Sequence, residues 1–119
     1  MKSPNEIQRE LSGFTGTESY TKYTFGLLLT DGAVHMAKIC QAFWLLDIVA
    51  SLKFHPKARR EPFLSITLTK HKNNNGATFT ADDGNKNIVY TQIITDTDFP
   101  LDEIKMYFTD NVLMLRSEY

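Results

Sequence analysis

The sequence is poor in cysteine, and this narrows the redox and metal chemistry open to it. Cys40 is the single cysteine among 119 residues, so the chain cannot form an internal disulfide or a paired-cysteine metal site. A lone thiol is typical of proteins from a reducing compartment. We interpret Cys40 as a small buried apolar residue on a helix, and we expect a cytoplasmic protein.

The sequence also lacks a segment suited to membrane insertion or export. Its longest apolar stretch, Gln41–Phe54, is shorter than a membrane span and contains Asp47 and Lys53. Residues 1–10 have no apolar core of a signal peptide. We therefore expect neither export nor association with a membrane.

The chain also lacks a strong net charge. The formal net charge is −1, with 42% hydrophobic and 23% charged residues, a composition typical of a soluble globular domain. The charge is unevenly spread, because residues 1–60 carry 8 Lys/Arg and 5 Asp/Glu, whereas residues 61–119 carry 5 and 9. Such polarity favours orientation of a partner, but it is too small to identify that partner as nucleic acid.

The apolar stretch Gln41–Phe54 organises the rest of the chain. At 100° per residue its apolar side chains cover most of the helix circumference, which predicts a core helix covered on several sides. We expect Phe43 and Trp44 to be structural anchors, and replacement of a buried Phe43 by alanine to cost ~3–5 kcal/mol. Asp47, the one acid of this helix, is expected to be buried and paired with amides, a hydroxyl or a cation.

Capping signals predict two helices before this one. Ser3 opens the first with a capping box, and Asp31 is the expected N-cap of a helix over Gly32–Ile39. A bend near Cys40–Gln41 separates that helix from the central one. The pattern Thr15–Glu18 resembles another capping box, so a short helical turn is expected to follow it through Tyr23.

After Pro56 the hydrophobic period changes from 3.6 to 2, which predicts strands. Strands are expected near 64–69, 77–81 and 88–94, followed by a hairpin whose turn is Asp110-Asn111. Helices followed by strands predict a single α+β domain over residues 1–119, with a helical part (1–56) packed on one face of a sheet part (63–117). The sheet is expected to be largely antiparallel, with about five strands. The strand residues expected to be buried are Leu64, Ile66, Leu68, Phe79, Val89 and Ile93.

Two groups of residues resemble a catalytic or metal site, but their spacing does not match either kind of site. Asp47, Ser51 and His55 share a helix stripe, but a serine nucleophile is usually exposed on a sharp turn with partners from elsewhere in the fold. The three histidines and Cys40 match no metal-ligand spacing. We therefore assign no catalytic residue, no metal site and no cofactor, and consider an enzyme the less favoured interpretation.

Two charged groups are candidate binding surfaces. A basic edge would be useful for a phosphate backbone, although a solvated linker is the simpler explanation; its members are Lys53, Lys57, Arg59, Arg60, Lys70 and Lys72. An acidic face would mimic nucleic-acid phosphates or dock on a basic protein, although aspartate is also a common turn former; its members are Asp82, Asp83, Asp96, Asp98, Asp102 and Glu103.

Four short motifs occur in order along the chain: Phe14–Glu18 (FTGTE), Thr30–Gly32 (TDG), Trp44–Asp47 (WLLD) and Asp98–Leu101 (DFPL). Together they resemble an uncharacterised family of small bacterial proteins that phages and plasmids often carry, and which has only a domain-of-unknown-function label. The resemblance implies a mobile-element setting in a bacterial cell. It implies no activity and transfers no catalytic or binding residue.

Three hypotheses of function follow. The first is a small non-enzymatic interaction protein of a mobile element that binds a host protein, such as a defence system, and inhibits or modulates it. The second is a nucleic-acid-binding module that uses the basic edge between Lys53 and Lys72. The third is a hydrolase or transferase of unrecognised type, which would need a pocket containing Asp47 or a histidine with a shifted pKa. The sequence leaves the oligomeric state open, including a homo-oligomer.

Overall fold

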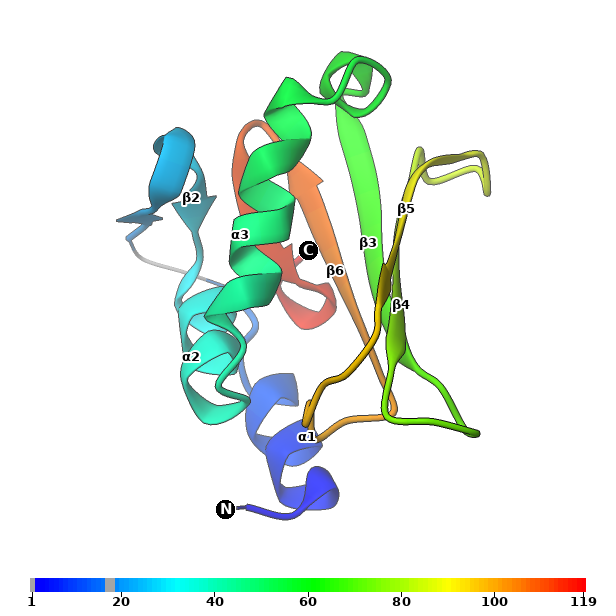
Figure 1. Cartoon of the computed structure of the whole chain (residues 1–119). Coiled ribbons are helices and arrows are strands. Elements are labelled where there is room, and N and C mark those ends of the chain that lie inside the picture. Colours follow the sequence, from blue (N-terminus) through cyan, green and yellow to red (C-terminus); the bar gives the residue numbers. More distant parts are fainter. Residues whose placement is uncertain (1, 17–18) are drawn as a thin grey trace.

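The computed structural model describes residues 2–16 and 19–119, and in these residues three α-helices pack on one face of a seven-stranded sheet (Figure 1). The helices are α1 (Pro4–Ser12), α2 (Asp31–Ile39) and α3 (Phe43–Ser51). The strands are β1 (Thr21–Lys22), β2 (Leu28–Leu29), β3 (Phe63–Lys70), β4 (Ala77–Asp82), β5 (Ile88–Ile94), β6 (Glu103–Thr109) and β7 (Val112–Leu115).

The predicted α+β class is confirmed, but the sheet is larger and mixed. Its order is β1-β2-β7-β6-β3-β4-β5, and β2 runs parallel to β7 while the other pairs are antiparallel. The expected sheet of about five strands is therefore a correct account of β3–β7 alone. The strands β1 and β2 were missed because two residues are too short to show a period of two.

The core lies between the helical layer and the sheet. Leu45, Leu46 and Val49 of α3 have no exposed surface, and they share one cluster with alternate residues of β3 and β4. Leu64, Ile66, Leu68 and Phe79 are buried as predicted. Phe99 and Leu101, from the segment between β5 and β6, close the cluster.

Of the two burial predictions for β5, the one for Ile93 is wrong and the one for Val89 is met only in part. Ile93 is 57% exposed, because it lies opposite Thr78 of β4 while its neighbour Gln92 lies opposite the buried Phe79. Val89 is only partly buried and packs against the core. The register of β4 and β5 shifts between Ala81 and Asp82, so one alternating pattern cannot describe the whole of β5.

The first helix begins as predicted, with the Ser3 capping box present. The N-cap of α2 is Thr30 rather than Asp31, because the Thr30 hydroxyl accepts a hydrogen bond from the amide of Ala33. The bend after α2 is confirmed by Gln41, whose φ of 52° interrupts the helical path.

The N-terminus of α2 also binds a side chain from the far end of the sequence. The Glu118 carboxylate accepts hydrogen bonds from the Thr30 hydroxyl (2.6 Å), the Gly32 amide (3.2 Å) and the Leu115 amide (3.0 Å). A Cβ at Gly32 would lie 2.5 Å from a Glu118 carboxylate oxygen. Glycine at this position therefore lets the carboxylate reach the helix, where the free amides and the helix dipole favour negative charge.

The helical turn expected through Tyr23 is absent, because Thr21 and Lys22 form β1 instead. The Thr15–Glu18 capping pattern that suggested it lies partly outside the described residues. None of the helices in the described part of the chain has the length and apolar character needed to cross a bilayer.

Candidate functional site

The outward face of α3 presents an aromatic side chain and an acid to solvent. Phe43, Asp47 and Ser51 are exposed on it, since residues four apart lie above one another on a helix. The sequence predicted that the helix would be covered on several sides, and Phe43 is instead 42% exposed. The expectation that Phe43 is a buried anchor is therefore wrong, because the core covers the opposite side of α3. Trp44 is partly buried, and its ring meets Phe99 edge to face.

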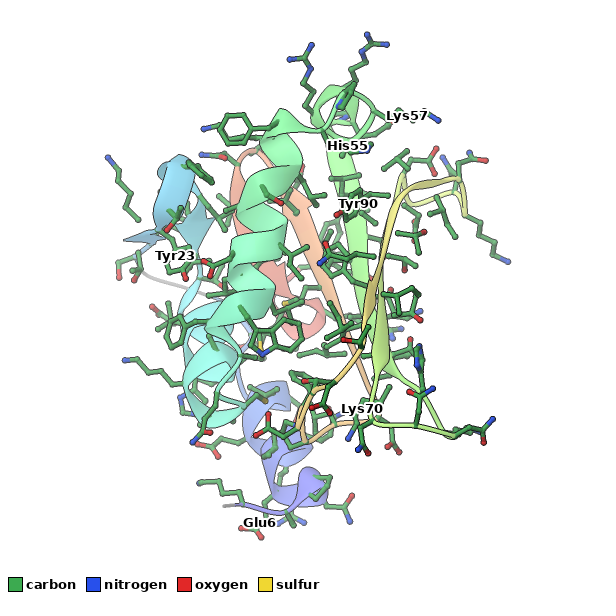
Figure 2. All side chains as sticks on the ribbon, in the orientation of Figure 1. Glu6, Tyr23, His55, Lys57, Lys70 and Tyr90 are labelled. Carbon is green, nitrogen blue, oxygen red and sulfur yellow. The ribbon has the colours of Figure 1, made fainter. Side chains whose placement is uncertain are left out.

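Asp47 is exposed rather than buried, but it does have a hydroxyl partner. The Tyr23 hydroxyl donates a 2.7 Å hydrogen bond to Asp47 Oδ1, and the Tyr23 ring stacks on Phe43 with centroids 6.3 Å apart. Burial raises the pKa of Tyr23 to about 12, with a further contribution from the hydrogen bond to Asp47. Asp47 therefore fixes Tyr23 against α3; Figure 2 shows Tyr23 beside this helix.

Phe25 and Phe54 extend this surface toward the end of α3. They are 50% and 62% exposed, and their rings meet edge to face at 4.8 Å. Phe54 ends the short 3-10 turn that follows α3, and Phe25 lies in another 3-10 turn, Thr24–Gly26. We call Tyr23, Phe25, Phe43 and Phe54 the aromatic surface.

The backbone of Phe25 is strained. Its φ is 58°, a left-handed conformation that is a genuine outlier for a bulky residue and costs of order 1–3 kcal/mol. Side chains on both sides hold the turn: Lys53 Nζ donates to the carbonyl of Phe25, and Asn111 Nδ2 donates to the carbonyl of Gly26 at 2.6 Å. The fold thus keeps a strained phenylalanine in place with about half of its surface exposed to solvent.

The six residues of the predicted basic edge do not form one edge. Lys53, Lys57, Arg59 and Arg60 precede β3, whereas Lys70 ends that strand and Lys72 follows it. A strand of 8 residues is roughly 25 Å long, and Figure 2 shows Lys57 and Lys70 near opposite ends of this strand. The structure therefore leaves four cations in the segment before β3, with Lys53 over the Phe54 ring, and separates the other two from them.

The predicted acidic face divides in the same way. Asp82 and Asp83 lie near the start of β3, where Asp82 is opposite Ser65. The other four acids, Asp96, Asp98, Asp102 and Glu103, follow β5 or begin β6, toward the other end of the sheet. Asp83 acts as a turn former: it accepts hydrogen bonds from Asn87 and from the Asn85 amide, and these lower the pKa of its carboxyl.

Asp47, Ser51 and His55 do not form a relay, because each has a different partner. Ser51 Oγ donates to the carbonyl of Ile48 at 2.6 Å, and His55 Nδ1 accepts hydrogen bonds from the amides of Lys57 and Ala58. Asp47 is bonded to Tyr23 as described. The three residues thus serve local structure.

The other histidines and the cysteine are also separate. His35 Nε2 lies 2.7 Å from Glu10, whereas His71 lies between Asn74 and Thr78. Cys40 is buried as predicted, and burial raises the pKa of its thiol to about 11. Among the described residues, no group of three or more histidine, cysteine or acidic side chains is arranged to hold a metal ion.

Two open hollows of about 490 Å³ each lie elsewhere on the described surface. One is bounded by α1, β6 and the residues after β7, and the other by α3 and β5. Neither lining includes Asp47 or a histidine, which the enzyme hypothesis needed. The second hollow contains Trp44 beside Asp96 and Asp98.

Sequence reasoning missed the aromatic surface, although part of a signal was present. Phe43, Asp47, Ser51 and Phe54 follow the spacing of one helix face, but an apolar helix alone does not reveal which side is uncovered. Phe25 comes from a separate turn, and only its backbone conformation places it beside Phe54.

Comparison with known proteins gives one match. The model of a family of unknown function, DUF6876, matches residues 5–119. Searches of curated proteins and of solved structures found no match.

Proposed function

The chain belongs to the family of unknown function DUF6876, and we propose that it is a small interaction protein that binds another protein through the aromatic surface. The resemblance noted in the sequence suggests the setting, a phage or plasmid in a bacterial cell. The partner is then a protein of that host, and binding inhibits or modulates it. The proposal assigns the chain no catalytic step.

The observation that carries this proposal is the exposed, strained Phe25. Aromatic residues are enriched at protein interfaces and account for many binding hot spots. Strain in a backbone persists only where the surroundings enforce it, and such positions cluster at binding and active sites. Here Lys53 and Asn111 enforce the turn, and its effect is to hold the Phe25 ring against Phe54 in solvent.

The charge around the aromatic surface defines the partner's chemistry. Lys57, Arg59 and Arg60 follow Phe54 closely and are exposed. In the described part of the chain, none of them forms an ion pair with a carboxylate. The partner surface that fits is an apolar recess for the Phe25–Phe54 pair, bordered by acidic side chains.

The decisive variant is Phe25→Gly. Glycine adopts a positive φ without a steric penalty, so this variant is expected to lose the ring, relieve the strain and keep a melting temperature close to that of the wild type. Binding to the partner should fall by about tenfold or more, the effect of losing an aromatic hot spot. The partner is first captured from a bacterial lysate and purified. Titration calorimetry then measures the stoichiometry and affinity of its binding to each variant, and thermal melting measures the stability of each variant.

The matched control is Tyr119→Ala, which removes an aromatic ring that is 73% exposed and contacts Phe63 and Tyr107 instead. It should leave binding unchanged. A captured protein that binds Phe25→Gly and wild type equally would refute a role for the aromatic surface.

A second candidate, nucleic-acid binding, is favoured by one observation. Lys53 Nζ lies 5.9 Å from the centre of the Phe54 ring, so cations and an exposed ring occur together, as in proteins that bind single strands. Gel shifts with single-stranded DNA and RNA at increasing salt test it. An affinity for nucleic acid that falls steeply as salt rises, and that is lower in the double variant Arg59→Ala/Arg60→Ala than in the wild type, would favour this function over a protein partner.

A further inference from the structure

The strand β5 ends the sheet with one side open. It is hydrogen-bonded to β4 and is the last strand in the sheet order. An edge strand presents a row of free amide and carbonyl groups that another strand can pair with. The edge of β5 is therefore a template for strand addition.

Proteins usually protect such edges, and β5 has little protection. Its seven residues, IVYTQII, include no charged residue and no proline, the side chains that most often block an edge. Ile88 and Ile93 are 60% and 57% exposed, and an isoleucine in water on a strand favours burial by a partner. The irregularity in the β4–β5 pairing affects only the Ile88 end, so the pairing from Tyr90 to Ile94 is regular.

We propose that β5 pairs with β5 of a second copy of this chain, antiparallel and about a two-fold axis at Thr91. A two-fold axis makes the interface self-complementary. It places Thr91 opposite Thr91 of the second copy and Tyr90 opposite Gln92, and it brings Ile93 near Val89. Two uncharged strands approach without like-charge repulsion, and each covers the exposed isoleucine of the other.

The charges that flank β5 fit this arrangement. Lys86 lies in the turn before the strand, and Asp96 lies the same distance from Thr91 on the other side. Antiparallel pairing about Thr91 therefore brings the turn that contains Lys86 in each copy to the end of β5 that Asp96 follows in the other. Both residues are exposed, and the described residues provide neither with an ion-pair partner. This charge complementarity favours a second copy of the chain as the partner of β5, because a symmetric interface contains the Lys86–Asp96 pairing twice.

The test is the molar mass in solution as a function of concentration, by light scattering after gel filtration and by sedimentation equilibrium. The wild type should be a dimer that dissociates on dilution. Ile93→Lys places a charge on the edge strand, two residues from the proposed axis, so it should be monomeric at concentrations where the wild type is dimeric. Because Ile93 is exposed, the variant should keep the wild-type melting curve measured at the dilution where both are monomers.

The control is Phe54→Lys, which puts the same charge on an exposed apolar position outside β5 and should leave the dimer intact. A charge exchange tests the register. Lys86→Glu should raise the dimer dissociation constant about threefold to tenfold, and addition of Asp96→Lys should restore it.

A wild type that is monomeric at every concentration, or a dimer insensitive to Ile93→Lys, overturns the proposal. Failure of the double charge exchange to restore the dimer overturns the pairing about Thr91. These outcomes are distinct from loss of the proposed function, because β5 and the aromatic surface share no residue and Ile93→Lys should still bind the partner protein.

Discussion

Phe43 and Leu46 lie on the same helix, three residues apart, in opposite environments. Leu46 has no exposed surface, whereas Phe43 is 42% exposed and stacks on Tyr23. Leu46→Ala should lower the free energy of unfolding by ~2–5 kcal/mol, because it leaves a cavity. Phe43→Ala should lower it by only about 1 kcal/mol, roughly the contribution of an aromatic pair. Urea denaturation of the two variants measures both values.

A loss near 4 kcal/mol in the free energy of unfolding of Phe43→Ala would contradict the exposed position of Phe43 on α3.

The contrast between Phe43 and Leu46 explains why the environments of single residues of α3 could not be assigned from the sequence. An almost entirely apolar helix has no clear polar side, so its uncovered face depends on what packs against it. In this protein the Thr24–Gly26 turn lies beside that face without covering Phe43.

At the scale of elements, the N-terminus of α2 depends on Glu118. Glu118→Ala removes a carboxylate that accepts hydrogen bonds from Thr30, Gly32 and Leu115. Hydrogen bonds to charged groups contribute ~1.5–3 kcal/mol each in favourable cases, and Glu118 is only partly buried, so a loss of about 2 kcal/mol is expected. Glu118→Gln keeps the shape and should lose less. Thermal melting of both variants checks this order.

Gly32→Ala provides an independent check, because its methyl group would meet the same carboxylate. It should destabilise the wild type, and the penalty should shrink in the Glu118→Ala background, since the carboxylate is then gone and only Leu115 Cδ1, 2.7 Å from the new Cβ, still obstructs it. Equal penalties in the two backgrounds would contradict a contact between these residues.

The longer elements could be predicted from sequence because their signals are local. The alternation of Leu64, Ile66 and Leu68 predicted β3, and the Ser3 capping box predicted the start of α1. Other features depend on distant residues. The strand β2 exists because it pairs with β7, and the choice of Thr30 over Asp31 as N-cap accompanies a contact with Glu118.

The candidate sites were less predictable than the fold for a similar reason. The sequence does not show that β3 separates the six cations, because four of them precede this strand and the other two lie at or after its end. The aromatic surface joins α3, the turn after it and a turn before α2, and its strained member is visible only in the backbone angles of Phe25.

For the whole molecule, stability should decline at alkaline pH. Burial raises the pKa of Cys40 from 9.0 to about 11 and contributes most to raising that of Tyr23 from 10.0 to about 12. Between those values the unfolded chain releases protons that the folded chain retains, so unfolding becomes easier as pH rises. The stabilisation is fully present below pH 9 and is lost progressively up to about pH 12. Urea midpoints across this range measure it.

Tyr23→Phe and Cys40→Ala separate the two contributions. The loss of stability that begins near pH 10 should be smaller in Tyr23→Phe than in the wild type. The loss of stability that begins near pH 9 should be smaller in Cys40→Ala. An unchanged pH profile in the double variant would assign the effect to other groups.

The place of β7 in the sheet has a consequence for how the chain is made. β7 lies between β2 and β6, so residues from the first and last thirds of the sequence meet in the middle of one sheet. A ribosome synthesises β7 after every other strand, and domains complete folding only when their parts have emerged. Until then β1 and β2 can pair only with each other, and the N-terminus of α2 has no carboxylate from Glu118. A nascent chain that stalls before β7 therefore exposes the apolar residues of β2 and β6, and it is a natural target for chaperones and proteases.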